Sequence, residues 1–221
     1  MRFVLAFALV LSAGARVAAL AGGQSDVKSA LAEGVRLERG GDARGALESY
    51  SWAAENAQAG SSDRGDALLA LANVEAGLGK YADSARHAAE ATRIFDALGD
   101  AAKAALALNR SGVTALYAGN YSEAERLLTL ALERSTAIGD RNLRAEQLGN
   151  LANVQFFVGR YAESARFTQE ALDIASASAA EPWAGRRRRI LLSNQATLLL
   201  RLGRYQEALS VSSSLNTFNA S

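Results

Sequence analysis

Small and apolar residues recur along the chain at the spacing of one helix face. After Tyr121 they follow at Ala124, Leu128, Ala131 and Ser135, in steps of three and four residues. Such steps keep side chains on one side of an α-helix, because the helix completes a turn about every 3.6 residues. This segment is therefore predicted to be a helix with one buried face.

A turn pattern of glycine, any residue and tyrosine recurs, and an apolar run of helical spacing precedes each glycine. A weaker first copy surrounds Asp42, with Tyr50 at the offset that Leu128 has in its own copy. Repetition at such a period is typical of stacked repeat architectures. The chain is therefore predicted to hold about five helix-turn-helix units. The four clear copies, with tyrosines 40, 40 and 44 residues apart, are Gly79-Lys80-Tyr81, Gly119-Asn120-Tyr121, Gly159-Arg160-Tyr161 and Gly203-Arg204-Tyr205.

The links between units repeat as well. Gly99-Asp100 and Gly139-Asp140 lie at matching places in two successive units. Glycine can adopt the left-handed conformation that ends a helix, and aspartate can cap the next helix by accepting a hydrogen bond from its free N–H groups. Each pair therefore predicts the end of one helix and the start of another.

The residues around each turn resemble the tetratricopeptide repeat family. That family has a small residue seven positions before the turn glycine, then a tyrosine, a small residue three positions later and an alanine seven further on. The corresponding residues here are Ala72, Gly112, Ala152 and Ala196; Tyr81, Tyr121, Tyr161 and Tyr205; Ser84, Ala124, Ser164 and Ala208; and Ala91, Ala131 and Ala171, with Leu215 in the last unit.

This resemblance implies an all-α fold, a right-handed superhelical solenoid of about five helix-turn-helix repeats. The period of about 40 residues exceeds the usual length of about 34, and the proline that often ends a repeat is missing. Both features are similar to the extended variety in bacterial regulators and kinesin light chains, and they imply longer second helices. The expected units cover roughly residues 27–60, 63–99, 102–139, 142–179 and 186–216.

Residues 1–21 have the features of a secretory signal peptide. Arg2 precedes an apolar stretch that ends in Ala19-Leu20-Ala21, the arrangement that signal peptidases cleave. We expect cleavage before Gly22, leaving residues 22–221 as an exported repeat domain, periplasmic or extracellular, without stable membrane insertion. A retained membrane anchor is the alternative, although Arg16 interrupts an apolar run that would need about 20 residues to span a bilayer.

Composition argues against several classes of function. The net charge is +1, which gives no overall attraction to nucleic acid, so no nucleic-acid partner is expected. The chain has no cysteine, and His87 is its one histidine. These counts offer no thiolate nucleophile, no histidine-based catalytic arrangement and no histidine or cysteine cluster for a metal. We expect no catalytic residue, no metal and no cofactor.

In the family, residues counted back from the turn glycine face a concave groove. Side-chain amides both donate and accept hydrogen bonds, which suits the backbone of an extended peptide. The alternative is that the asparagines bond between neighbouring helices and stiffen the stack. The positions that the resemblance assigns to this peptide-binding groove are Asn73, Asn109, Arg110, Tyr117, Asn150, Asn153, Phe156, Phe157 and Asn194.

A run of four arginines, Arg186, Arg187, Arg188 and Arg189, lies in the one lengthened linker. Positive charge near a helix start opposes the helix dipole, so helix stability does not account for the run. One interpretation is a solvated linker, and the other is a basic patch that docks an acidic partner or anionic lipid head groups.

We expect a non-catalytic scaffold that binds a protein or peptide of unknown identity in its groove. One alternative is the recognition region of a larger exported protein, such as a protease that resembles the caspase-like CHAT family. Another is an assembly factor that acts through its outer or terminal faces. The last repeat lacks a polar capping helix in the sequence. Self-association through that repeat is therefore a further alternative.

Overall fold

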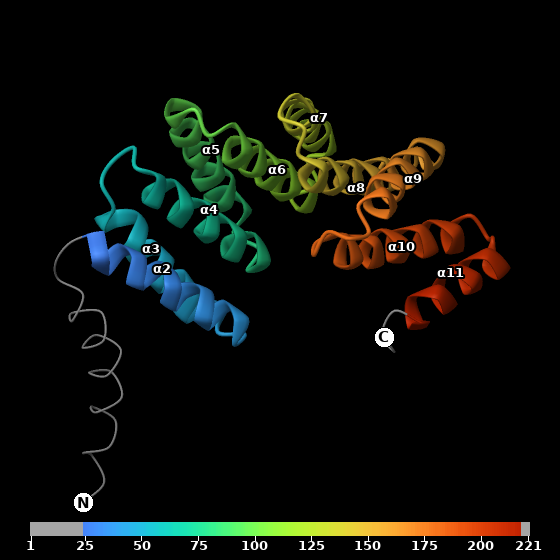
Figure 1. Cartoon of the computed structure of the whole chain (residues 1–221), viewed down its shortest axis with the longest axis horizontal. Coiled ribbons are helices and arrows are strands. Elements are labelled where there is room, and N and C mark those ends of the chain that lie inside the picture. The colour runs from blue at the N-terminus through green and yellow to red at the C-terminus, as the bar shows by residue number, and fades with distance from the viewer. Residues whose placement is uncertain (1–23, 218–221) are drawn as a thin grey trace, which may run out of the picture.

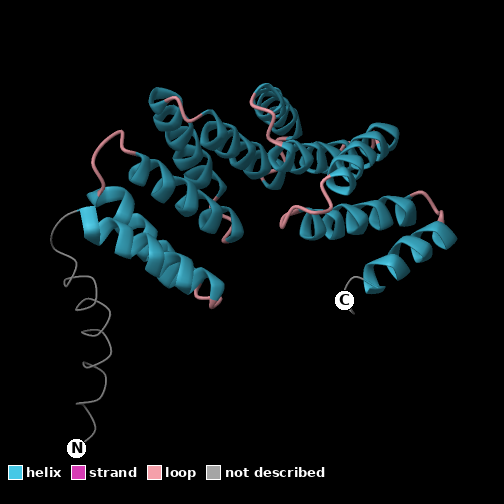
Figure 2. Cartoon of the chain, viewed as in Figure 1, coloured by secondary structure: helices cyan, strands magenta, loops and turns pink. Residues whose placement is uncertain are grey.

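The computed structural model describes residues 24–217, and within that range all regular structure is helical (Figures 1 and 2). In this described part of the chain, ten helices follow one another as five antiparallel pairs, each joined by a short turn. The predicted all-α solenoid is confirmed. The first and second helices of the pairs are α2 (Gln24–Arg39) and α3 (Ala43–Asn56), α4 (Ser62–Gly77) and α5 (Tyr81–Leu98), α6 (Ala101–Tyr117) and α7 (Tyr121–Ala137), α8 (Arg141–Phe157) and α9 (Tyr161–Ala177), and α10 (Ala184–Arg201) and α11 (Tyr205–Thr217).

The turns form as their residues predict. Gly119 has a φ of 78°, a left-handed backbone conformation that would be strained in a residue with a side chain. This conformation lets the amide of Asn120 donate to the carbonyl of Ala115 at 2.8 Å, closing the end of α6. At the links between units, the side chains of Asp100 and Asp140 accept from the backbone amides three residues later, so both predicted caps are confirmed.

Small side chains let the two helices of a unit approach closely. Ala124 and Ala131 on α7 have no exposed surface. Gly112 on α6 faces the same helix, and a Cβ atom added there would lie 2.6 Å from Cγ of Leu128. No such Cβ could be accommodated without a shift of the helices, so the repeated small positions fix the spacing within a unit.

The five units form an arch (Figure 1). First helices contact the first helices of neighbouring units, namely α2 with α4, α4 with α6, α6 with α8 and α8 with α10. The backbones of second helices, by contrast, approach first helices but not one another, and the ion pair between Arg134 on α7 and Asp96 on α5 spans one of the resulting gaps. Elements on the inside of a curve are closest together, so the first helices line the inner, concave face and the second helices lie outside.

The predicted signal peptide, residues 1–21, lies outside the described residues. Among the helices between residues 24 and 217, none has the length and apolar character needed to cross a membrane.

Candidate functional site on the inner face

At the start of the arch, a hydrogen-bond cluster centred on Glu38 joins two units. Glu38 lies near the end of α2 and accepts from the Asn73 amide on α4 at 2.8 Å through one carboxylate oxygen. Its other oxygen accepts from the hydroxyl of Tyr50 at 3.0 Å. Burial of that phenol, reinforced by the hydrogen bond to Glu38, raises the pKa of Tyr50. The amide of Asn73, a residue predicted to line the groove, is therefore used inside the protein.

A second cluster joins the last three first helices, α6, α8 and α10. Asn109 on α6 is 1% exposed, and its amide donates to Oε1 of Glu146 on α8 at 3.0 Å. Its carbonyl oxygen accepts from the Asn150 amide at 2.9 Å. Oε2 of Glu146 forms an ion pair with Arg187 on α10, which also reaches Asn142 at 3.3 Å. These contacts follow the structural alternative, in which asparagines bond between neighbouring helices.

Other predicted groove residues are left unused by the fold. Asn153 and Asn194 lie on α8 and α10 and are partly buried, and within residues 24–217 neither makes a side-chain hydrogen bond. Arg110 on α6 is also partly buried, and it too has no hydrogen bond or ion pair in the described chain. These three side chains are the polar groups that a ligand could engage.

Aromatic residues line the end of the inner face where the first helices finish. Tyr117 is 61% exposed and Phe157 is 57% exposed. Phe157 stacks on Tyr121 with ring centroids 6.0 Å apart, and Phe156 packs edge-on against Phe157 at 5.7 Å. These contacts hold the rings in place while leaving a large apolar surface open, which is typical of binding surfaces rather than of isolated exposed side chains.

The basic run is arranged differently from the predicted linker. Helix α10 begins at Ala184, so Arg186, Arg187, Arg188 and Arg189 lie inside the helix, in its first two turns. Arg187 and Arg188 are partly buried, and Arg187 is committed to Glu146. Arg186 and Arg189 are exposed. Arg187 pairs with a carboxylate 41 residues earlier in the chain, a contact that local sequence spacing does not predict.

A sequence profile of the tetratricopeptide repeat matches residues 103–177, which correspond to α6–α9, the third and fourth units. These two units are tetratricopeptide repeats. No protein of curated function matches its sequence.

Several solved structures share this fold at low sequence identity. A putative kinesin light chain repeat protein of Podosopora anserina is 14% identical with a TM-score of 0.68, covering 89% of this chain and 95% of its own. A Rap protein in complex with competence and sporulation factor is 14% identical with a TM-score of 0.74, covering 85% and 52%. BtubC from P. vanneervenii is 17% identical with a TM-score of 0.69, covering 96% and 84%.

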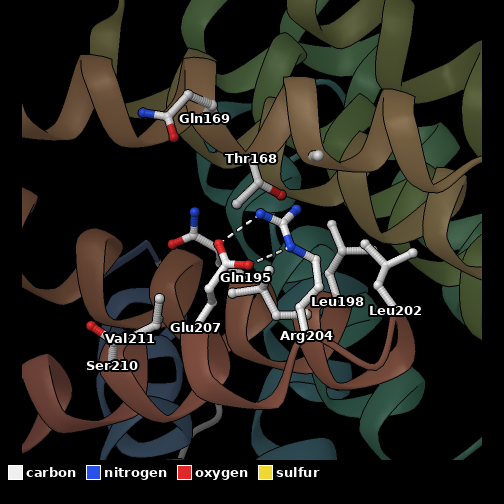
Figure 3. Close-up of a pocket in the computed structure, with 11 residues that line it drawn as sticks. Thr168, Gln169, Gln195, Leu198, Leu202, Arg204, Glu207, Ser210 and Val211 are labelled. Carbon is white, nitrogen blue, oxygen red and sulfur yellow. Dashed lines mark hydrogen bonds and ion pairs between the residues drawn. The ribbon is translucent and has the colours of Figure 1, made fainter.

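The outer face of this repeat protein carries clefts where adjacent second helices stay apart. One of about 420 Å³ lies between α9 and α11 above α10 (Figure 3). Thr168 and Gln169 line one side of it, and the ion pair between Arg204 and Glu207 lies on the other, at 2.6 Å. Similar clefts of about 330 Å³ and 530 Å³ lie above α4 and α6. They follow from the spacing of the repeats, and each is lined by an arginine–glutamate ion pair, which is Arg64–Glu90 in the cleft above α4 and Glu123–Arg126 in the cleft above α6.

The histidine of this repeat protein is used within the fold. Nδ1 of His87 lies 2.7 Å from a carboxylate oxygen of Glu75, and both side chains are largely buried. Between residues 24 and 217, no three histidine, aspartate or glutamate side chains converge on a position suited to a metal ion.

Sequence reasoning missed Glu38 and Glu146, the acceptors of both inner-face clusters. Glu146 could have been found, because it lies four residues before Asn150 and seven before Asn153 and so shares their helix face. Glu38 was harder to find because its unit lacks the tyrosine that sets the register of the other repeats.

Proposed function

We propose that this tetratricopeptide repeat protein is an exported, non-catalytic scaffold that binds another protein, or a peptide segment of it, along its inner face. The observation that carries the proposal is a set of first-helix side chains that have either no polar partner among the described residues or a large exposed aromatic surface. Each sits on a first helix and faces the concave side, where stacked helical repeats bind their ligands. The set comprises Arg110, Tyr117, Asn153, Phe157 and Asn194.

The chemistry of this set supports a peptide ligand. Amides such as those of Asn153 and Asn194 pair with backbone N–H and C=O groups, while Tyr117 and Phe157 offer apolar surface for side chains. The Rap protein of similar fold is described in complex with competence and sporulation factor, which is consistent with a ligand-binding use of the arch.

Replacing Asn153 and Asn194 with alanine together should lower affinity for the partner by about 1–3 kcal/mol, because backbone groups of the ligand lose their hydrogen bonds. The melting temperature should barely change, since neither side chain bonds within the described chain. The partner is first identified by pull-down from the protein's own compartment with mass spectrometry, and its affinity is then measured by calorimetry.

The matched control is Asn150→Ala on the same inner face. Its amide donates to Asn109, so this change should reduce stability and leave the affinity of the folded protein unchanged. If the Asn153→Ala, Asn194→Ala double variant binds as tightly as the wild type, the inner face is not the binding surface. The assembly-factor alternative, acting through the outer or terminal faces, would then be favoured.

Export is the second part of the proposal and rests on the sequence of residues 1–21. Amino-terminal sequencing of the protein recovered from outside the cytoplasm should begin at Gly22. An intact Met1 on a membrane-bound form would instead support the retained anchor.

A further inference from the structure

The outer cleft above α6, called here the α6 cleft, has a volume of about 530 Å³ and lies between the second helices α5 and α7. The residues that line it extend over about two turns of each helix, which makes the cleft about 12 Å long. These dimensions suit a small molecule, since ligand sites commonly enclose about 300–1,000 Å³. Much of the wall is formed by alanines, namely Ala82, Ala85, Ala89, Ala115 and Ala118.

The next unit shows why the α6 cleft is open. There, Glu125 on α7 accepts hydrogen bonds from Gln155 on α8 at 2.9 Å and from Arg160, just before α9, at 2.6 Å. These three long side chains occupy space between the helices. The same three positions 40 residues earlier in the sequence hold two alanines and an asparagine, so the space is left open. These shorter residues are Ala85, Ala115 and Asn120.

Ser111 adds an unused hydrogen-bonding group to this apolar cleft. It lines the cleft from α6 and is 8% exposed, and its hydroxyl makes no hydrogen bond with any described residue. The positions 40 residues before and after it hold the buried leucines Leu71 and Leu151. The serine therefore leaves out apolar volume that its neighbours supply. Its hydroxyl can be satisfied only by what enters the cleft, and leaving such a group unpaired is costly.

The charges at the α6 cleft indicate a neutral occupant. Glu123 and Arg126 line it from α7 and pair with each other at 2.7 Å. They are the only charged side chains among the described residues that line the cleft. A charged molecule would therefore lose water without gaining an unpaired charge of opposite sign.

We propose that the α6 cleft binds a small neutral molecule with an apolar body and a hydroxyl group. The apolar body packs against the alanine walls. The hydroxyl of the ligand pairs with that of Ser111, since each can both donate and accept a hydrogen bond. This site lies on the outer face and goes beyond the proposed function, on which it does not depend.

The test uses the full chain of 221 residues with ¹³C-labelled alanine methyl groups, followed by NMR. The probe is 2-naphthol, and its matched analogue is 2-methylnaphthalene, which replaces the hydroxyl with a methyl group. Both compounds should shift the methyl signals of the alanines that line the α6 cleft. The signal of Ala30 on α2 should not move. Affinities follow from the shifts as each compound is titrated.

Ser111→Ala keeps the cleft open and removes the hydroxyl. It should weaken binding of 2-naphthol about threefold to tenfold, the effect of one neutral hydrogen bond, and leave binding of 2-methylnaphthalene unchanged or slightly tighter. The filling variant, Ala85→Glu with Ala115→Gln and Asn120→Arg, copies the residues of the next unit and should bind neither compound. Because the next unit accommodates these side chains, the variant should fold, which circular dichroism verifies. The control is Ala137→Glu at the exposed end of α7, outside the cleft, which should bind both compounds as the wild type does.

Three results would overturn the proposal. The first is an absence of cleft shifts with 2-naphthol, or shifts that persist in the filling variant. The second is an equal effect of Ser111→Ala on both compounds, which would remove the hydrogen bond from the argument. The third is a dimer of the probe-free chain in sedimentation that the filling variant dissociates, since a second copy would then occupy the cleft. The inner-face function is tested separately, by the Asn153→Ala, Asn194→Ala variant.

Discussion

Ala131→Phe is expected to destabilise the central repeats by about 1–3 kcal/mol, the usual cost of overpacking a tight interface. Ala131 is completely buried on α7 at a position where every well-formed repeat has alanine, so a phenyl ring must push the two helices of the unit apart. The measurement is urea unfolding followed by circular dichroism at 222 nm.

Ala137→Phe is the control on the same helix. Ala137 is exposed at the end of α7, so the same substitution there should alter the free energy of unfolding by less than about 0.5 kcal/mol. Equal destabilisation by both variants would mean that the repeat spacing does not depend on the small residue at position 131.

Asn109→Ala is the second change with a large expected effect, about 1–3 kcal/mol. It removes both the amide that donates to Glu146 and the carbonyl oxygen that accepts from Asn150, in a site with almost no access to water. Glu146 would keep only the ion pair with Arg187. The loss should appear in urea unfolding as an earlier transition of the units that contain α6 and α8.

Asn153→Ala is the matched comparison, because it makes the same chemical change within a first helix and gains the same few tenths of a kcal/mol in helix propensity. Asn153 has no side-chain hydrogen bond among residues 24–217. The free energy of unfolding of the Asn153→Ala variant should therefore be unchanged or slightly higher. If Asn109→Ala proved as harmless as Asn153→Ala, the inner-face cluster would contribute nothing to the stack.

The repeat fold could be predicted from the sequence because its determinants are local and occur several times. A glycine at a left-handed turn, as at Gly119, or an aspartate cap, as at Asp140, acts on residues within one turn of itself. Small residues such as Ala131 show their role because the same type returns in successive units. Periodicity therefore identified the helices, the turns and the buried faces.

The division of the asparagines could not be predicted in this way. Asn109 and Asn153 are the same residue type on first helices, yet one is buried in hydrogen bonds and the other is unused. What distinguishes them is an acceptor on another unit, since Glu146 lies 37 residues beyond Asn109. Arg187 was misjudged for the same reason, because its role as an ion-pair partner depends on a residue 41 positions away. Local spacing carries no information on such pairs.

The separation of the second helices has a mechanical consequence. Hydrogen bonds such as that from Asn150 to Asn109 connect the units along the inner line, whereas the backbones of adjacent second helices stay apart and long side chains such as Arg134 and Asp96 bridge α7 and α5. We therefore expect the inner face of the arch to resist stretching more than the outer face does. A partner that widens or narrows the arch would do elastic work mainly on the outer clefts, so the stack can adjust its curvature to the length of its ligand without breaking the cluster that holds it together.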